Sequence, residues 1–160
     1  KVEDTHRLLW LHLPPFYDTS LLDYIEVTRR APIIFEEVNF VGWEPLDPQD
    51  PYRSLARKVL TVGFMDPAQR VQTIVKHAPD VRYNGCILYN HGFGRCSMAD
   101  SSFIKHLREE LNKAEIPLLV LDGDCVDPTI DPCSTETKIT AYIEALNEQK
   151  YGNIFGALKK

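Results

Sequence analysis

Short apolar runs alternate with longer amphipathic segments along the chain, and a polar or Gly/Pro-rich loop closes each run. The runs are apolar at successive positions, as in strands buried on both faces, and lie at residues 7–13, 32–35, 85–90 and 117–121. The segments between them repeat apolar residues at helical spacing. This spacing predicts helices at 51–62, 67–77 and 102–114, one from Ser20 with a Ser20–Asp23 capping box, and a last one capped by Ser134.

This order of elements predicts an α/β fold, a three-layer α/β/α sandwich with a four-stranded parallel sheet. We expect a flavodoxin-like or Rossmann-like arrangement with strand order 2-1-3-4. Residues 1–150 are expected to form a single domain, and residues 151–160 a tail that is loose or docks on a partner. In such sheets ligands bind beyond the carboxyl ends of the strands. Four loops therefore become candidates for a site, at residues 14–20, 39–43, 90–97 and 122–133.

Length and charge narrow the function classes. The chain has 160 residues, with 18 Lys and Arg against 23 Asp and Glu, and a net charge of −5. An acidic balance argues against a nucleic-acid module, which usually carries a basic face. No apolar run approaches the roughly 20 residues that cross a bilayer, so we expect no membrane partner and a cytoplasmic location. Because the sequence starts at Lys1 rather than Met, we expect a fragment of a longer chain.

The cysteines suggest reduced thiols rather than a disulfide scaffold or a structural zinc site. The chain has four of them and no C-x-x-C pair. Cys86 lies inside an apolar run and is expected in the core. His12 lies on the first predicted strand and is expected in the core as well. Cys96, Cys125 and Cys133 stand next to turn residues, so their roles stay open.

The loop after the third strand combines two glycines with Asn, His, Arg, Cys and Ser. Glycines there let the backbone approach a ligand, and successive amides can bind an anion. The loop fits neither the dinucleotide fingerprint nor a Walker loop. Cys96 could act as a nucleophile with His91, or as a thiolate ligand beside Arg95, whose charge favours the thiolate. A plain tight turn is the third alternative.

The loop after the fourth strand carries three carboxylates, Asp122, Asp124 and Asp127. Such a cluster can bind Mg²⁺, position a substrate hydroxyl, or cap turns and helices. Spacing alone leaves these alternatives open.

With these loops in order, the chain resembles the 2-hydroxyacyl-CoA dehydratase and benzoyl-CoA reductase subunit family, of the 2-hydroxyglutaryl-CoA dehydratase D-component type. The similarity is to the C-terminal half of such a subunit and covers nearly the whole chain. Its most specific part is the Leu-Asp-Gly-Asp strand end with a Lys-Ile-Thr helix about 14 residues further on. The matching segments are residues 8–11 with 14–15, 46–48 with 51 and 55–57, 84–91, 116–124, and 137–139 with 143–145.

The resemblance implies anaerobic radical chemistry on an acyl-CoA substrate. Its expected partners are a second homologous dehydratase subunit and an ATP-dependent activator protein that reduces a 4Fe-4S cluster. One electron converts a 2-hydroxyacyl-CoA thioester to a ketyl radical, from which the 2-hydroxyl group leaves. The family's C-terminal half contributes one cluster cysteine, from the loop after the third strand. Aligned without a gap on His91 and Lys105, that position falls on Gly94, so Cys96 ligates only if the loop is re-registered. Thr129 stands where the family often has arginine.

These observations lead to a first hypothesis and two alternatives. The first is a C-terminal dehydratase-like domain that is inactive in isolation, with Cys96 as an iron–sulfur ligand. Around Cys96 we expect Asn90, His91 and Ser97, and along the cleft Asp122, Asp124 and Asp127; no residue is assigned as catalytic. The main alternative is a non-catalytic module without a cluster that binds CoA or an anion or docks a partner. A flavin-binding, flavodoxin-like domain is the third.

Overall fold

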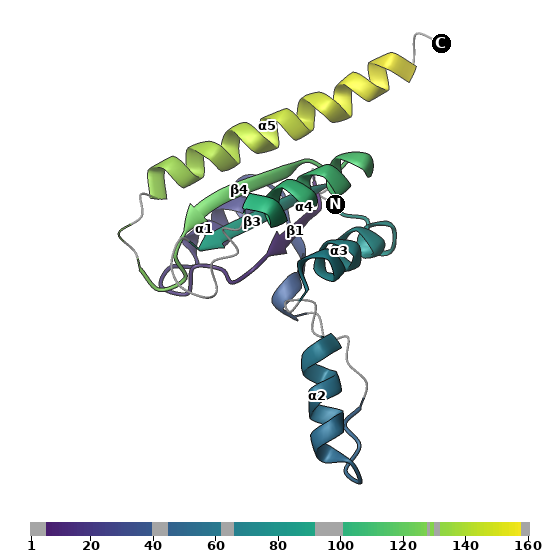
Figure 1. Cartoon of the computed structure of the whole chain (residues 1–160). Coiled ribbons are helices and arrows are strands. Elements are labelled where there is room, and N and C mark those ends of the chain that lie inside the picture. Colours follow the sequence, from purple (N-terminus) through teal and green to yellow (C-terminus); the bar gives the residue numbers. More distant parts are fainter. Residues whose placement is uncertain are drawn as a thin grey trace.

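A computed structural model describes residues 6–39, 45–61, 66–91, 101–127, 129 and 132–157. Its sheet has four parallel strands in the order β2-β1-β3-β4, which confirms the predicted order (Figure 1). The strands are β1 Leu8–Leu11, β2 Ile33–Glu36, β3 Gly85–His91 and β4 Leu118–Gly123.

Helices cover both faces of the sheet, which makes the predicted three layers. One face packs against α3 (Pro67–Val81) and α4 (Ser101–Lys113). The other packs against α5 (Pro132–Ala157) and against α1 (Ser20–Asp23), which continues as the π-helical turn η1 (Tyr24–Thr28). Figure 1 shows α5 along one side of the sheet, opposite α3. The short 3-10 turn η2 spans Glu37–Asn39.

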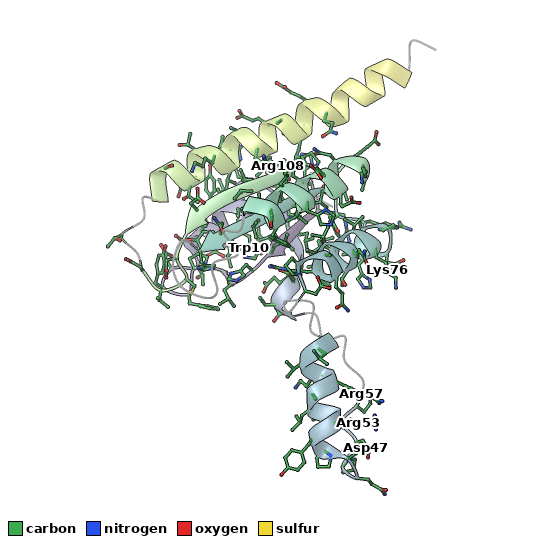
Figure 2. The ribbon with its side chains drawn as sticks, in the orientation of Figure 1. Trp10, Asp47, Arg53, Arg57, Lys76 and Arg108 are labelled. Atoms are coloured by element: carbon green, nitrogen blue, oxygen red, sulfur yellow. The ribbon has the colours of Figure 1, made fainter. Side chains whose placement is uncertain are left out.

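Successive strand residues supply the two cores in turn. In β1, Leu9 and Leu11 face α3 and α4, whereas Leu8 and Trp10 face α1 and α5. Figure 2 shows Trp10 within the body of the molecule, and its side chain is 1% exposed. Cys86 of β3 is fully buried, as predicted. Because both sides of each strand are covered, the strands are continuously apolar instead of alternating.

Helix α3 begins as predicted and ends later than predicted. The Asp66 carboxylate accepts a hydrogen bond from the Ala68 amide, and Pro67 occupies the first helical position. The predicted end at His77 is wrong, because the helix continues through Pro79 to Val81. A proline near the end of a helix removes only one helical hydrogen bond, so Pro79 does not end α3. The helix ends at Arg82, because this residue adopts a left-handed φ of 58°.

The first and last helices also differ from the expected capping. The Ser20–Asp23 box does not form, because the Ser20 amide and hydroxyl both bind the Asp18 carboxylate at 2.8 Å. Helix α5 begins at Pro132, before the predicted cap Ser134, and a proline is favourable in the first turn. Its helical backbone also continues to Ala157, through most of the stretch expected to be a tail.

Helix α2 (Pro51–Thr61) lies away from the sheet (Figure 1). Figure 2 shows Arg53 and Arg57 on this helix, remote from Trp10. Apolar side chains on α2 are exposed, among them Tyr52 at 86% and Leu60 at 67%. None of the helices in the described ranges combines the length and the hydropathy of a membrane span.

Candidate functional site

The carboxyl ends of β3 and β4 lie side by side. The parallel register pairs Asn90 with Asp122 and His91 with Gly123. Because all four strands run in the same direction, the loop after β1 meets the same edge. The carboxyl ends of the first, third and fourth strands therefore share one edge of the sheet, as predicted. Residues 40–44, with Trp43, lie outside the described part of the chain.

Asn90 and Asp122 contact each other across the two strands. The Asn90 side-chain amide donates to the Asp122 carboxylate at 3.0 Å. Asn90 is 9% exposed, whereas Asp122 is exposed. The side-chain oxygen of Asn90, Oδ1, is buried and has no hydrogen-bond partner among the described residues. Buried polar atoms normally have a partner, so this oxygen is a candidate acceptor for a ligand's hydrogen-bond donor.

His91 is held in one orientation at the end of β3. Its Nε2 lies 3.0 Å from the Leu13 carbonyl oxygen, which can only accept, so Nε2 carries the proton. Nδ1 therefore has the lone pair when the imidazole is neutral. The ring is 3% exposed and packs against Tyr89, with ring centroids 5.2 Å apart at an angle of 84°.

His12 also belongs to this edge, although the sequence indicated only a core position. It is 7% exposed, but it follows β1 directly and has a φ of 71°. Left-handed φ values are uncommon outside glycine and often occur at functional sites. The backbone amide of His12 donates to Glu37 at 3.2 Å, and its ring lies 4.5 Å from that of His91.

The carboxylates of the β4 loop form turns. Asp124 Oδ1 accepts the backbone N–H groups of Val126 at 2.8 Å and Asp127 at 3.1 Å. Asp127 Oδ1 accepts the Thr129 N–H at 2.9 Å, and this hydrogen bond lowers the pKa of the exposed Asp127 carboxyl. Turn formation, one of the predicted alternatives, therefore describes both residues.

Cys125 joins His91 and Asp124 in a group that the sequence did not predict. Their ligand atoms, one ring nitrogen, one carboxylate oxygen and one sulfur, all lie within 4.8 Å of one another. His91 is buried and the other two are partly exposed. Cys125 stands immediately after the Leu-Asp-Gly-Asp strand end, which was the available signal in the sequence. Cys96 and Ser97, the other predicted site residues, lie outside the described part of the chain.

The described residues do not by themselves fit a 4Fe-4S cluster, which takes four thiolates. Of the two free thiols that the structure describes, Cys86 is fully buried, and burial raises its pKa well above its ordinary value. Of these two thiols, Cys125 is the one that lies at the strand edge with partial exposure. A cluster would need thiolates from Cys96 or from other segments.

A pocket opens between the loop after β1 and the start of α5. Its walls include Tyr17 and Asp18 from that loop, Tyr89 from β3, and Thr135 and Glu136 from α5. Burial raises the pKa of the Tyr89 phenol, which stays protonated and donates to the Asp124 carbonyl at 3.3 Å. Tyr89 therefore lines the pocket and also contacts the loop after β4.

Comparison with known proteins identifies the family. The family model described as 2-hydroxyglutaryl-CoA dehydratase, D-component, matches residues 1–146. No curated protein matches the chain significantly. The match covers the whole sheet, the polar edge and most of α5, and it agrees with the resemblance carried by the sequence motifs. The chain therefore belongs to the 2-hydroxyglutaryl-CoA dehydratase D-component family.

Proposed function

We propose that this chain is the C-terminal domain of an iron–sulfur 2-hydroxyacyl-CoA dehydratase-like subunit. The complete enzyme would remove water from a 2-hydroxyacyl-CoA by radical (ketyl) elimination, after one-electron reduction by an ATP-dependent activator. A second homologous subunit would complete it, and this domain alone would be inactive. The observation that carries the proposal is the family match over residues 1–146.

The polar edge of the sheet supports a role in lining the substrate cleft. Asn90 presents a buried carbonyl oxygen that can accept a hydrogen bond, while its amide group is held by Asp122. Asp122 remains exposed and can accept a hydrogen bond from a substrate hydroxyl. Asp124 and Asp127 shape the wall by fixing the loop after β4. In this proposal His91 and Ser97 stand beside the cluster ligand.

The cluster would supply one-electron redox chemistry when bound. Cys96 is the proposed thiolate from this chain, and the remaining ligands would come from segments outside it. What the described residues contribute is a packed edge of the sheet. Tyr89 and His91 pack against each other there, and both are buried.

Iron and acid-labile sulfide analysis tests this proposal. The sample is the full-length subunit that contains this chain, purified anaerobically together with its second subunit. We expect both elements in the wild-type protein and a clear loss of both in Cys96→Ser. Cys125→Ser is the matched control, because it removes a thiol from the same edge and should keep the cluster. Wild-type protein without iron and sulfide would refute the cluster and favour the non-catalytic module that binds CoA or an anion or docks a partner.

A further inference from the structure

We propose that His91, Asp124 and Cys125 bind one divalent transition-metal ion of the zinc class, each with one side-chain atom. The three ligand atoms lie within 4.8 Å of one another at the carboxyl ends of β3 and β4. This site goes beyond the dehydratase proposal and does not rest on it, because it uses only the side chains of three residues that the structure describes.

The donor set selects the class of metal. A thiolate, an imidazole and a carboxylate together suit Zn²⁺, Co²⁺ or Fe²⁺, whereas Mg²⁺ and Ca²⁺ prefer oxygen ligands only. Bonds of about 2.0 to 2.3 Å place tetrahedral zinc ligands roughly 3.3 to 3.8 Å apart. The group therefore needs to close by at most about 1.5 Å, which rotation of the partly exposed Cys125 and Asp124 side chains can supply.

Two of the three ligands, His91 and Asp124, are already held by hydrogen bonds that do not compete with the metal. His91 donates Nε2–H to the Leu13 carbonyl, which leaves Nδ1 to ligate. A metal-binding histidine usually donates its other N–H in this way. Asp124 uses Oδ1 for two backbone N–H groups, so Oδ2 is available to the metal.

The backbone around Cys125 is also fixed. Its carbonyl oxygen accepts the Phe16 amide at 2.9 Å, which ties the loop after β4 to the loop after β1. The preceding carbonyl, of Asp124, accepts the Tyr89 hydroxyl. These bonds hold the thiol-bearing residue close to the end of β3, where His91 lies.

Charge and coordination number indicate what such an ion would do. A thiolate and a carboxylate with a neutral imidazole carry two negative charges, which balance a divalent cation. Three protein ligands leave the fourth position of a tetrahedral ion open, as in catalytic rather than structural zinc sites. The ion would therefore hold a water molecule or another small ligand at the polar edge of the sheet.

Titration of the metal-free protein with Co²⁺, followed by competition with Zn²⁺, tests the site. We expect a stoichiometric thiolate-to-cobalt charge-transfer absorption that Zn²⁺ displaces. Cys125→Ser should abolish this absorption and weaken Zn²⁺ binding at least about 100-fold, because loss even of an outer-shell partner costs about 10- to 100-fold. Asp124→Asn should weaken binding at least about 10-fold, while its side-chain carbonyl still accepts the two turn hydrogen bonds.

Two matched controls separate this site from its neighbours and from the cluster. Asp122→Asn alters an exposed carboxylate at the same edge, and Cys96→Ser alters the proposed cluster thiol; both should bind Co²⁺ as the wild type does. The proposal would be overturned if Cys125→Ser and Asp124→Asn bound Zn²⁺ with wild-type affinity. It would also be overturned if Cys96→Ser lost the cobalt charge-transfer absorption while Cys125→Ser kept it. Because the cluster is measured separately, as iron and sulfide under anaerobic conditions, either proposal can fail while the other stands.

Discussion

The phenol ring of Tyr89 lies directly against the backbone of Gly123, in the space where a β-carbon on residue 123 would sit. The Tyr89 hydroxyl then donates to the carbonyl of the next residue, Asp124. His91 follows two residues after Tyr89 and is paired with Gly123 in the sheet. This close approach therefore lies at the paired ends of β3 and β4, next to the proposed ligands.

Replacing Gly123 with alanine should destabilise the fold. The new methyl group overlaps the Tyr89 ring, so either the ring or the end of β4 must move. Overpacking of this kind costs about 1 to 3 kcal/mol of the free energy of unfolding. Chemical denaturation of the Gly123→Ala protein measures the loss.

A double-mutant cycle with Tyr89→Leu checks the cause of that loss. If the overlap with the ring is responsible, Gly123→Ala should cost clearly less in the Tyr89→Leu background than in the wild type. Equal costs in both backgrounds would show that the methyl group is harmful for another reason.

The ion pair between Glu37 and Arg70 should be critical for stability. The Arg70 guanidinium, 1% exposed, donates to both carboxylate oxygens of Glu37 and lies 4.6 Å from the Phe103 ring centroid. Glu37→Gln leaves a buried positive charge without its counter-charge, which costs about 3 to 5 kcal/mol. Thermal or urea unfolding measures this effect.

The surface pair of Lys113 and Glu110, 2.6 Å apart, gives a matched control. Water screens that pair, so Lys113→Gln should change the unfolding midpoint little. A small effect of Glu37→Gln, similar to that of Lys113→Gln, would mean that the buried pair contributes little net stability.

The protein should lose stability at alkaline pH. Burial raises the pKa of the Cys86 thiol and of the Tyr142 phenol above their ordinary values of 9.0 and 10.0. The folded state therefore keeps protons that the unfolded state releases, so this contribution is complete below pH 9.0 and is lost as the pH rises. Denaturant unfolding between pH 7 and about pH 11 measures the decline.

Two substitutions locate the origin of that pH dependence. Cys86→Ala should delay its onset from the thiol range towards the phenol range, and Tyr142→Phe should reduce its slope above pH 10.0. Tyr52→Phe is the control, because that side chain is 86% exposed on α2. An unchanged pH profile in Cys86→Ala and in Tyr142→Phe would contradict the assignment.

Apolar residues on α2 should contribute little to the stability of the sheet domain. Leu60 is 67% exposed, and α2 lies away from the sheet (Figure 1). Leu60→Ser should therefore change the free energy of unfolding by no more than about 0.5 kcal/mol. By comparison, Leu111→Ala removes a fully buried side chain and should cost about 2 to 5 kcal/mol. A loss of similar size in Leu60→Ser would show that α2 packs on the domain in solution.

Much of the fold could be predicted from local patterns. Continuous apolar runs separated by helices predicted four buried parallel strands, and the expected flavodoxin-like or Rossmann-like arrangement predicted their order. Asp66 with Pro67 predicted the start of α3. The errors lie at helix ends, such as Pro79 inside α3 and the start of α5 at Pro132. Capping and termination depend on a few hydrogen bonds whose partners are chosen by the surrounding structure, so sequence spacing predicts them less well.

For the candidate site, too, local features could be predicted and long-range contacts could not. The sequence by itself determined that polar loops follow the first, third and fourth strands. It also determined that these strands end at one edge, because a parallel sheet brings their carboxyl ends together. Only the tertiary structure decided that His91 meets Cys125 and that His12 turns its ring onto His91. The first contact depends on the register of β3 with β4 and the second on the register of β1 with β3, which join residues more than 30 positions apart. Local residue patterns report the environment of each residue, whereas packing between distant segments decides which residues touch.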